Sequence, residues 1–335
     1  MGDSPQELSK KEAKKSMLRE RCTIHQAVGL LVRGEPVILP TETVYGLTCD
    51  ATSPQAVERL FALKGRDSRF PFALLVANLA EAERLTSHFP SKAKTLAKRF
   101  WPGPLTLVLP RGPAFPATVV HPGEPLGGLR VPDHPIAQAV LRRFGRPLAA
   151  PSANRSGDIS PTTWEEARKP FEGLVTCALD GGECRLGFDS TVVSFEGEKA
   201  SVLRLGALPL EELEKVIGKV DLPYESQRKG PRTRAFPKPL WIVQDLEELS
   251  GKNLARAGLL AWGVVPASYR RNLAVTCNLS ARGDPSEAMP KFYRALRILL
   301  ENPHVHCIFA LLWPESGLGR SLNAKLQELG QTPNA

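Results

Sequence analysis

Several features that would decide the function class are scarce or missing in this chain. Its longest apolar runs, such as Phe72–Ala77, are far too short to span a bilayer. The N-terminus, Met1–Ser4, leads into a charged segment rather than an apolar signal core. The sequence has no Walker loop, no Rossmann fingerprint and no H-E-x-x-H motif, and no cluster shows metal-ligand spacing. We therefore expect a cytoplasmic protein without a metal site of its own.

Cysteine is also sparse, and its spacing argues against zinc and disulfide chemistry. No two of the six cysteines are spaced as C-x-x-C, so a zinc knuckle is not expected. The nearest pair, Cys177 and Cys184, flanks two glycines, and a disulfide between them is disfavoured. Scattered cysteines in a chain of this length predict reduced, mostly buried thiols.

The 335 residues are enough for two domains with separate cores. A hydrophobic fraction of 42% and a charged fraction of 24% are typical of an ordinary soluble protein. Part of the net charge of +9 gathers before Arg21 and within residues 228–238. A solvated tail and linker would explain these clusters, and so would attraction to nucleotide phosphates or RNA. Charge alone supports encounter with a polyanion, not specificity.

Residues 22–218 interleave helices with short strands. Thr23 caps a helix over 24–33, and Ser53-Pro54 starts a helix that ends at Lys64. This alternation predicts an α/β or α+β domain with a twisted mixed sheet and flanking helices. The remaining predicted helices cover 81–88, 91–100, 135–144 and 210–217, and the strands cover 37–39, 72–77, 105–109, 128–131, 147–150, 175–179, 191–195 and 202–205.

Residues 219–238 lack periodicity and carry proline, glycine, serine and charge, which predicts a basic linker. A second α/β pattern then fills residues 239–335 and predicts a smaller open parallel sheet flanked by helices. Residues 1–21 form a basic extension in this scheme. The predicted strands of the second domain cover 241–243, 258–262 and 305–312, and its helices cover 246–254, 286–300 and 318–329.

Three polar segments follow apolar elements and suit a small anionic ligand. Pro40–Leu47 turns abruptly polar after the strand 37–39, and such strand ends usually line a ligand cleft. Lys64-Gly65-Arg66 ends a helix, where the cations could either cap the helix or clamp phosphate. Ser152-Ala153-Asn154 follows a strand and could be an ordinary turn.

Two arginines lie among apolar strand residues and need a partner wherever they are buried. They are Arg130 and Arg204, and both are candidate ligand cations. Asp189-Ser190-Thr191 opens a strand and could be only a turn at the strand edge, and Ser160 could simply belong to a helix cap. His134 has no evident serine or cysteine partner in the sequence, and we interpret it as structural.

Together and in this order, these segments resemble the YrdC-type L-threonylcarbamoyladenylate synthases. The resemblance spans about residues 22–218, and the second domain is similar to that of the long two-domain form, best at Gly317–Arg320. Each motif alone would be weak, whereas six in order make chance similarity improbable. The motifs are Pro40–Leu47, Lys64-Gly65-Arg66, Trp101–Thr106, Arg130–Pro135, Ser152-Ala153-Asn154 and Asp189–Val193.

This resemblance implies that ATP, L-threonine and bicarbonate give threonylcarbamoyl-AMP and pyrophosphate. Mg²⁺ would accompany the triphosphate, and other proteins would transfer the threonylcarbamoyl group to adenosine in tRNA. By the same resemblance, threonine would be held by Thr41, Thr43, Arg130, Ala150 and Ser190, with Arg130 on its carboxylate. ATP would be held by Lys64, Arg66, Ser152, Asn154, Ser160 and Arg204, and Lys64 and Arg66 would be the catalytic cations.

The sequence departs from this family at several positions. Asp67 replaces a usual proline, while Phe70 and Leu75 stand where polar residues are common; Leu126 and Leu205 replace a threonine and a proline. A Tyr-Arg-His-Tyr-Ala-Pro-like linker stretch corresponds here to residues 233–237, in which Phe236 keeps a ring without a hydroxyl. We hypothesise that the linker crosses the mouth of the cleft.

Three alternatives remain open at this stage. The same basic cleft could belong to a non-catalytic RNA-binding module. The domain could instead be a carbamoyl transferase that makes carbamoyl-adenylate, although such proteins usually carry zinc-finger-like cysteine pairs. The departures at Asp67, Phe70 and Leu75 also fit a catalytically weakened paralogue.

Overall fold

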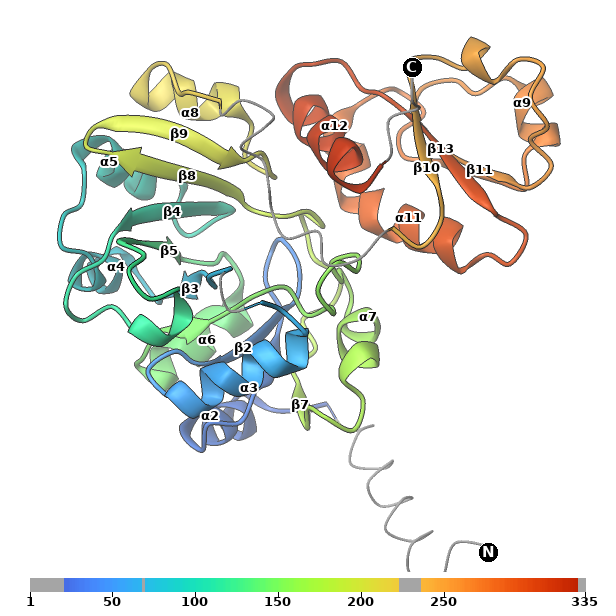
Figure 1. Ribbon diagram of the computed structural model, residues 1–335. Coiled ribbons are helices and arrows are strands. Elements are labelled where there is room, and N and C mark those ends of the chain that lie inside the picture. The colour runs from blue at the N-terminus through green and yellow to red at the C-terminus, as the bar shows by residue number, and fades with distance from the viewer. Residues whose placement is uncertain (1–20, 68–69, 223–235, 331–335) are drawn as a thin grey trace, which may run out of the picture. The chain divides into compact units, whose positions relative to one another are not determined.

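The computed structural model describes residues 21–67, 70–222 and 236–330 of the chain (Figure 1). A mixed sheet of nine strands has the order β7-β1-β2-β6-β3-β5-β4-β8-β9, and a second sheet of four strands has the order β10-β13-β11-β12. The predicted fold class is confirmed by these two sheets and their helices. The predicted N-terminal extension and most of the predicted linker lie outside the described residues.

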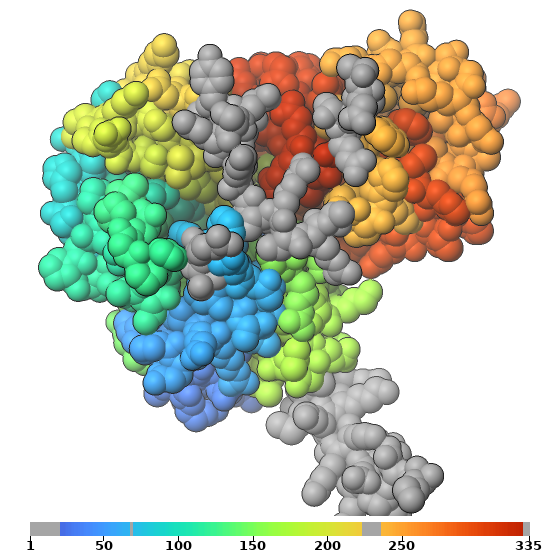
Figure 2. Space-filling view, viewed as in Figure 1, coloured from blue at the N-terminus to red at the C-terminus, as the bar shows by residue number. Residues whose placement is uncertain are grey.

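The chain divides into two compact units, each described here by itself. The first takes the described residues of Met1–Phe89, Ala97–Ser156 and Ser160–Cys184, and the second those of Pro90–Leu96, Gly157–Ile159 and Arg185–Ala335. The predicted domain boundaries at 218 and 239 remain a proposal. Within the first unit, α3 packs against η1. Figure 2 shows blue and teal residues of this unit on one face of the molecule.

In the first unit, the elements that were predicted begin and end within a few residues of their predicted positions. Strand β1 runs antiparallel to β2 and parallel to β7, so β1 is buried between two neighbours. The elements are α2 (Ile24–Val32), β1 (Val37–Leu39), β2 (Gly46–Asp50), α3 (Pro54–Lys64), β3 (Leu74–Leu75), α4 (Leu79–Leu85), α5 (Ser91–Phe100), β4 (Leu105–Pro110), η1 (Ala117–Val119), β5 (Leu126–Arg130), α6 (Pro135–Phe144), β6 (Leu148–Ala149), α7 (Trp164–Arg168), η2 (Lys169–Phe171) and β7 (Cys177–Ala178).

Local chemistry explains where the helix that carries Lys64 begins and ends. The Ser53 side chain accepts a hydrogen bond from the Ala56 amide, and Pro54 occupies the first helical position. Gly65 ends α3 with a left-handed φ of 58°, a conformation that glycine adopts without steric cost. The sequence pattern therefore fixes the position of Lys64 at the last turn of α3.

The second unit contains a fully parallel sheet, as predicted, but with four strands instead of the three expected. Strand β13 lies between β10 and β11, and β12 is the other edge next to β11. The elements are β8 (Thr191–Glu196), β9 (Lys199–Arg204), α8 (Leu210–Ile217), β10 (Leu240–Val243), η4 (Glu247–Leu249), β11 (Ala257–Ala261), α9 (Ala267–Asn272), β12 (Val275–Asn278), α10 (Pro285–Ala288), η5 (Met289–Lys291), α11 (Phe292–Glu301), β13 (Cys307–Leu311) and α12 (Gly317–Leu329).

Two predicted helices of this unit were wrong in extent. The helix over 246–254 is only the short η4: the Asp245 carboxylate accepts the amides of Glu247 and Glu248 at its start, but the backbone is extended at Ser250 and left-handed at Gly251, with φ of 73°. The helix over 286–300 is divided by Pro290, which lacks an amide proton, into α10, η5 and α11. Strands β2 and β12 and helix α9 were not predicted.

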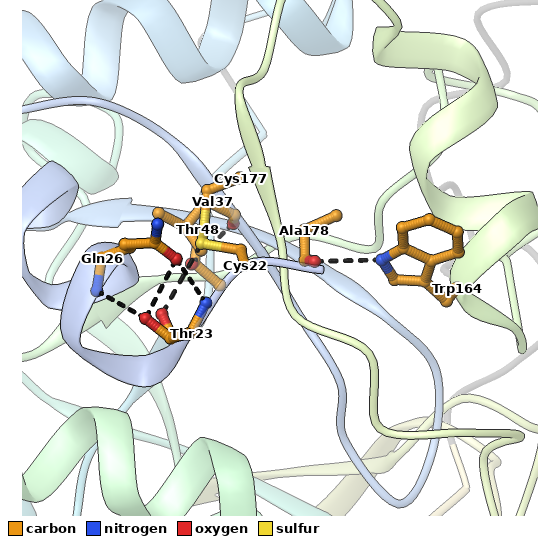
Figure 3. The surroundings of a disulfide bond; sticks show 8 residues. All are labelled: Cys22, Thr23, Gln26, Val37, Thr48, Trp164, Cys177 and Ala178. Carbon is orange, nitrogen blue, oxygen red and sulfur yellow. Dashed lines mark hydrogen bonds between the residues drawn. A yellow bond between two sulfur atoms is a disulfide. The ribbon is translucent and has the colours of Figure 1, made fainter. Parts of the chain in front are cut away.

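A disulfide between Cys22 and Cys177 corrects the prediction that all six cysteines are reduced thiols (Figure 3). Their Cα atoms are 5.4 Å apart, and the bond ties the residue before α2 to β7 across 155 residues of sequence. Cys49 and Cys184 are buried free thiols, and Cys277 and Cys307 are half-buried ones. Sequence spacing could not reveal the pair, because β7 meets this part of the chain only after folding.

Replacing Cys22 with serine should lower the free energy of unfolding, because the cross-link no longer restricts the unfolded chain. The expected loss is ~2–5 kcal/mol, measured by urea denaturation. In the presence of reductant, wild-type protein should unfold at the same urea concentration as the variant. Cys307→Ser, which removes a free thiol, should have the unfolding free energy of wild type. A wild-type unfolding curve that reductant leaves in place would contradict the structural role of this bond.

The apolar core beneath β1 supports the polar segment that follows this strand. Leu31 of α2, Val37 and Leu39 of β1, and Leu141 of α6 belong to one buried cluster. The chain thus leaves a rigid strand at Leu39 before its polar residues begin. Among the described residues, no helix is long and apolar enough to cross a membrane.

Candidate active site

The segment after β1 buries polar side chains instead of exposing them. Thr41, Glu42 and Thr43 are at most 4% exposed. The Thr41 hydroxyl donates to the Val44 carbonyl at 2.6 Å and accepts the amides of Thr43 and Val44, both at 3.2 Å. These bonds fold the segment into a turn, which satisfies its backbone groups in the interior.

Arg130 meets this turn through a buried ion pair. Its Nη2 donates to Glu42 Oε1 at 2.7 Å and to Thr43 Oγ1 at 2.8 Å, while its Nε donates to the Gly103 carbonyl at 3.2 Å. The second Glu42 oxygen accepts the Asp133 amide at 3.0 Å. Arg130 and Thr43, both predicted threonine contacts, therefore lie together, and the guanidinium orientation is fixed from three sides.

Sequence reasoning missed Glu42 as the partner of Arg130. The signal was present, because a buried arginine requires an acceptor and Glu42 lies between the two candidate threonines. It could not be assigned, because the two residues are 88 positions apart in the chain. Sequence reasoning also missed that Cys184 lies beside the backbone of Thr41. Burial raises the pKa of the Cys184 thiol to about 12, although a hydrogen bond with the Thr41 backbone opposes the shift.

Tyr45 and His134 make hydrogen bonds to the backbone near the turn after β1. The Tyr45 hydroxyl donates to the Gly182 carbonyl at 2.8 Å and accepts the Gly181 amide at 3.0 Å. Burial raises the pKa of Tyr45 well above its usual value, so the phenol stays protonated. His134 Nδ1 accepts the Ile136 amide at 3.2 Å as the cap of α6, and burial lowers its pKa. His134 thus has the structural role that the sequence indicated.

Lys64 is a buried cation and not a solvated helix cap. It is 2% exposed, and its Nζ donates to the Ser152 carbonyl at 2.7 Å, to the Asn154 carbonyl and to Asn154 Oδ1 at 3.3 Å. The Ser152 hydroxyl donates to Asn154 Oδ1 at 2.5 Å. Three of the predicted ATP contacts therefore form one cluster around a positive charge, which suits an anionic ligand.

Arg66 is held just beyond the helix. Its Nε donates to the Phe70 carbonyl at 3.2 Å and its Nη2 to the Pro71 carbonyl at 3.3 Å, and the guanidinium lies 5.4 Å from the Phe72 ring centroid. Arg66 therefore lies beside Phe70, one of the positions at which the sequence departs from the family pattern. The hydrogen bond from Arg66 is accepted by the backbone carbonyl of Phe70. Ser160, another predicted ATP contact, is buried.

The turn after β1 and the turn around Ser152 are adjacent. Gly46 and Ser152 form an antiparallel bridge, the Ala153 amide donates to the Tyr45 carbonyl at 2.8 Å, and the Leu47 amide donates to the Pro151 carbonyl at 2.9 Å. Backbone bonds thus place the predicted threonine segment against the predicted ATP segment. Ala150 joins the same strand region through its amide, which donates to the Ala73 carbonyl at 3.1 Å.

The two remaining predicted contacts lie together in the second unit. Arg204 donates from Nη2 to the Ser190 carbonyl at 2.9 Å and hydroxyl at 3.0 Å, and from Nε to the same carbonyl at 3.1 Å. Its side chain is 42% exposed, so it is not a buried strand arginine. That Ser190 and Arg204 share one ligand with the first-unit residues remains a prediction.

Only the two ends of the predicted basic linker, residues 219–222 and 236–238, belong to the described residues. Residues 223–235, which include most of the stretch compared with the family's linker motif, lie outside the described residues. Lys238, at the end of this predicted linker, donates to the carbonyls of Leu299 at 3.1 Å and Asn302 at 2.7 Å. This cation therefore caps the end of α11. In the part of the chain that the structure describes, no three His, Cys, Asp or Glu residues gather as a metal site.

Comparison with known proteins places this geometry in context. The Sua5/YciO/YrdC family model, described as telomere recombination, matches residues 29–206. The threonylcarbamoyl-AMP synthase of Pyrococcus abyssi is 44% identical over 201 residues, covering 60% of this chain and 59% of that protein, less than two thirds of its length. The Bacillus subtilis threonylcarbamoyl-AMP synthase is 36% identical over 321 residues, covering 91% and 92%.

A solved structure extends the likeness over both compact units. The crystal structure of Pyrococcus abyssi Sua5 complexed with L-threonine has a TM-score of 0.82 to this chain at 31% identity. The match covers 94% of this chain and 98% of that one.

Proposed function

The chain belongs to the Sua5/YciO/YrdC family, and we propose that, like its relatives, it is a threonylcarbamoyl-AMP synthase. It is a nucleotidyltransferase that supplies threonylcarbamoyl-AMP for threonylcarbamoyladenosine modification of tRNA. The family membership expected from the six ordered motifs is thereby confirmed.

The observation that carries this proposal is the pair of adjacent clusters around Arg130 and Lys64. Arg130 with Thr43 offers a cation and a hydroxyl for an amino-acid carboxylate. Lys64 with Ser152 and Asn154 offers a buried cation and amide and hydroxyl groups for a polyphosphate. The bridge between Gly46 and Ser152 joins the two clusters, as a reaction between an amino acid and a nucleotide requires.

The proposed chemistry needs alignment and charge neutralisation and no covalent protein intermediate. The threonine amine and bicarbonate form a carbamate with loss of water. A carbamate oxygen then attacks the α-phosphorus of ATP, the bond from this phosphorus to the bridging oxygen breaks, and pyrophosphate leaves. Lys64 and Arg66 would stabilise the charge on the phosphates, since preorganised cations stabilise charge that develops in the transition state.

Magnesium would enter with the triphosphate. Mg²⁺ is commonly bound through substrate phosphates and waters and few protein carboxylates. This mode fits the described residues, among which no acidic cluster of metal-binding size occurs. When bound, the ion would neutralise phosphate charge; Lys64, Arg66 and Arg204 remain this chain's own contribution.

The departures at Phe70 and Leu75 have structural explanations that favour an active enzyme. Phe70 contributes its backbone carbonyl to Arg66, and its ring centroid lies 6.0 Å from the guanidinium. Leu75 is 4% exposed within the apolar cluster beneath β1. The catalytically weakened alternative also rests on Asp67, and the turnover of the enzyme decides it. RNA binding through the basic surface and hand-over to a tRNA-modifying machinery remain part of the proposal.

Pyrophosphate release from ATP tests this function when each substrate is withheld in turn. We expect release with L-threonine, bicarbonate and Mg²⁺, and loss of the signal when threonine or bicarbonate is omitted. Serine in place of threonine should give less product, because a site that binds the carboxylate and side chain discriminates between analogues. Salt-dependent RNA binding without any threonine-dependent release would instead favour the non-catalytic module.

A further inference from the structure

A buried ionic cluster lies at the start of β8, next to the predicted substrate contact Ser190. The Asp189 carboxylate accepts Lys325 Nζ of α12 at 3.0 Å and the Tyr293 hydroxyl of α11 at 2.9 Å, both on Oδ2. Asp189 and Lys325 are 7% and 8% exposed, and Tyr293 is 2% exposed. All of these residues belong to the second compact unit.

Aromatic packing fixes the same loop against α11. The Phe188 ring stacks on Tyr293 with centroids 5.4 Å apart and meets Phe292 edge-on at 5.5 Å. Gly187 has φ of 54°, and a Cβ on it would lie 2.6 Å from the Pro290 carbonyl oxygen. The chain can approach η5 so closely only with glycine there. Residues 187–189 are therefore held in place by residues one hundred positions further along the sequence.

The charges of this cluster depend on one another. Burial disfavours the charged form of Asp189, yet the charges of Lys325 and Arg204 outweigh it and hold the pKa of this carboxyl well below its usual range. Burial also disfavours the ammonium of Lys325, and nearby acidic groups including Asp189 raise its pKa above the usual value. Removing Lys325 would leave a buried carboxylate in need of another cation.

Arg204 is the cation that could replace Lys325. Its Nη1 lies 4.0 Å from Asp189 Oδ2, beyond hydrogen-bond reach, while its Nη2 and Nε bond to Ser190. A buried carboxylate left without Lys325 would attract this guanidinium away from Ser190. Both Ser190 and Arg204 are predicted substrate contacts, so the competition would alter the site itself.

We propose that Lys325, assisted by Tyr293, is a positioning residue that holds the Asp189 carboxylate and thereby keeps Arg204, the proposed ATP contact, bonded to Ser190, the proposed threonine contact. That ATP is the ligand affected rests on the proposed function, whereas the contacts among Lys325, Asp189 and Arg204 do not depend on it. It gives α11 and α12 a role in the reaction although neither helix carries a predicted substrate contact.

The test compares Lys325→Met with a double variant in the full-length enzyme. Lys325→Met should raise KM for ATP about tenfold while kcat changes less than about threefold, because Arg204 leaves the binding site and the chemistry is otherwise intact. The double variant Asp189→Asn/Lys325→Met removes the attracting charge as well, and should return KM to within about twofold of wild type.

Two further variants complete the test: one is a control for charge removal near Lys325, and the other weakens the hold on Asp189 without changing Lys325. Glu328 binds Lys325 at 2.7 Å from the exposed side, so Glu328→Gln removes a charge beside Lys325 without releasing Asp189 and should leave KM unchanged. Tyr293→Phe removes only the hydroxyl bonded to Asp189 and should raise KM for ATP about threefold, less than Lys325→Met, because Lys325 still holds the carboxylate. If Lys325→Met fails to fold, the KM of Tyr293→Phe for ATP tests the positioning role instead.

Hydrogen exchange over residues 187–206 supplies a readout that does not depend on activity. Exchange should be faster in Lys325→Met and return to the wild-type rate in the double variant. A KM in Lys325→Met equal to that of wild type, or a double variant as impaired as the single one, would overturn the inference. If wild-type enzyme released no pyrophosphate, the proposed function would fail, and the exchange comparison would still decide the positioning role.

Discussion

Replacing Arg130 with methionine is expected to raise KM for L-threonine about a hundredfold, because a charge-assisted contact to a carboxylate is worth ~2–3 kcal/mol. Arg130 is already oriented by Glu42 and the Gly103 carbonyl, so little ordering is needed when threonine binds. KM for ATP should change far less, since Lys64 and its partners lie in the neighbouring cluster. Steady-state pyrophosphate release with each substrate varied separately measures both constants.

This substitution also leaves Glu42 without its cation, so stability must be separated from binding. The double variant Glu42→Gln/Arg130→Met removes both buried charges and should regain much of any lost unfolding free energy, while threonine binding stays weak. Arg143→Met, at an exposed position of α6, should have wild-type kinetics. Threonine affinity that recovers in the double variant would show that Arg130 acts on folding and not on the amino acid.

Replacing Lys64 with methionine should lower kcat/KM for ATP by about 10²–10³, the usual effect of removing one preorganised charge-stabilising group. The variant loses a buried ammonium that contacts both Ser152 and Asn154. Part of the effect will come from loosening of the 152–154 turn, and the unfolding free energy measures that part. Single-turnover pyrophosphate release at saturating ATP isolates the chemical step.

A matched control for Lys64 is available on another helix. Lys98 is exposed near the end of α5, so Lys98→Met removes a lysine from the end of a helix without touching the cluster. Its activity should equal that of wild type. If Lys64→Met were fully active, the cation would be only a structural tie between α3 and the 152–154 turn, and the proposed phosphate role would be wrong.

The sequence was sufficient wherever a signal is local. Ser53 and Pro54 predicted the start of α3, and Lys64 lies at its end as expected. The parallel sheet of the second unit followed from alternating strands and helices. That Thr43 and Arg130 lie together was implied by the family resemblance and not by the strand ends themselves.

Partners distant in the chain escaped sequence reasoning. The pairs Glu42–Arg130 and Asp189–Lys325 join residues that only the folded sheet and helices bring within 3 Å of each other. The disulfide of Cys22 was missed for the same reason. The helix expected over 246–254 ends early because the backbone is extended at Ser250 and left-handed at Gly251.

The most direct test of the proposed function follows carbon from bicarbonate into the nucleotide. The full-length enzyme is incubated with ATP, L-threonine, Mg²⁺ and ¹³C-labelled bicarbonate, and the nucleotides are resolved by mass spectrometry. We predict an AMP adduct heavier than AMP by a threonylcarbamoyl group, carrying one ¹³C atom and absent without threonine. A labelled adduct that forms equally well without threonine, or ATP that remains unchanged in the complete mixture, would contradict the account.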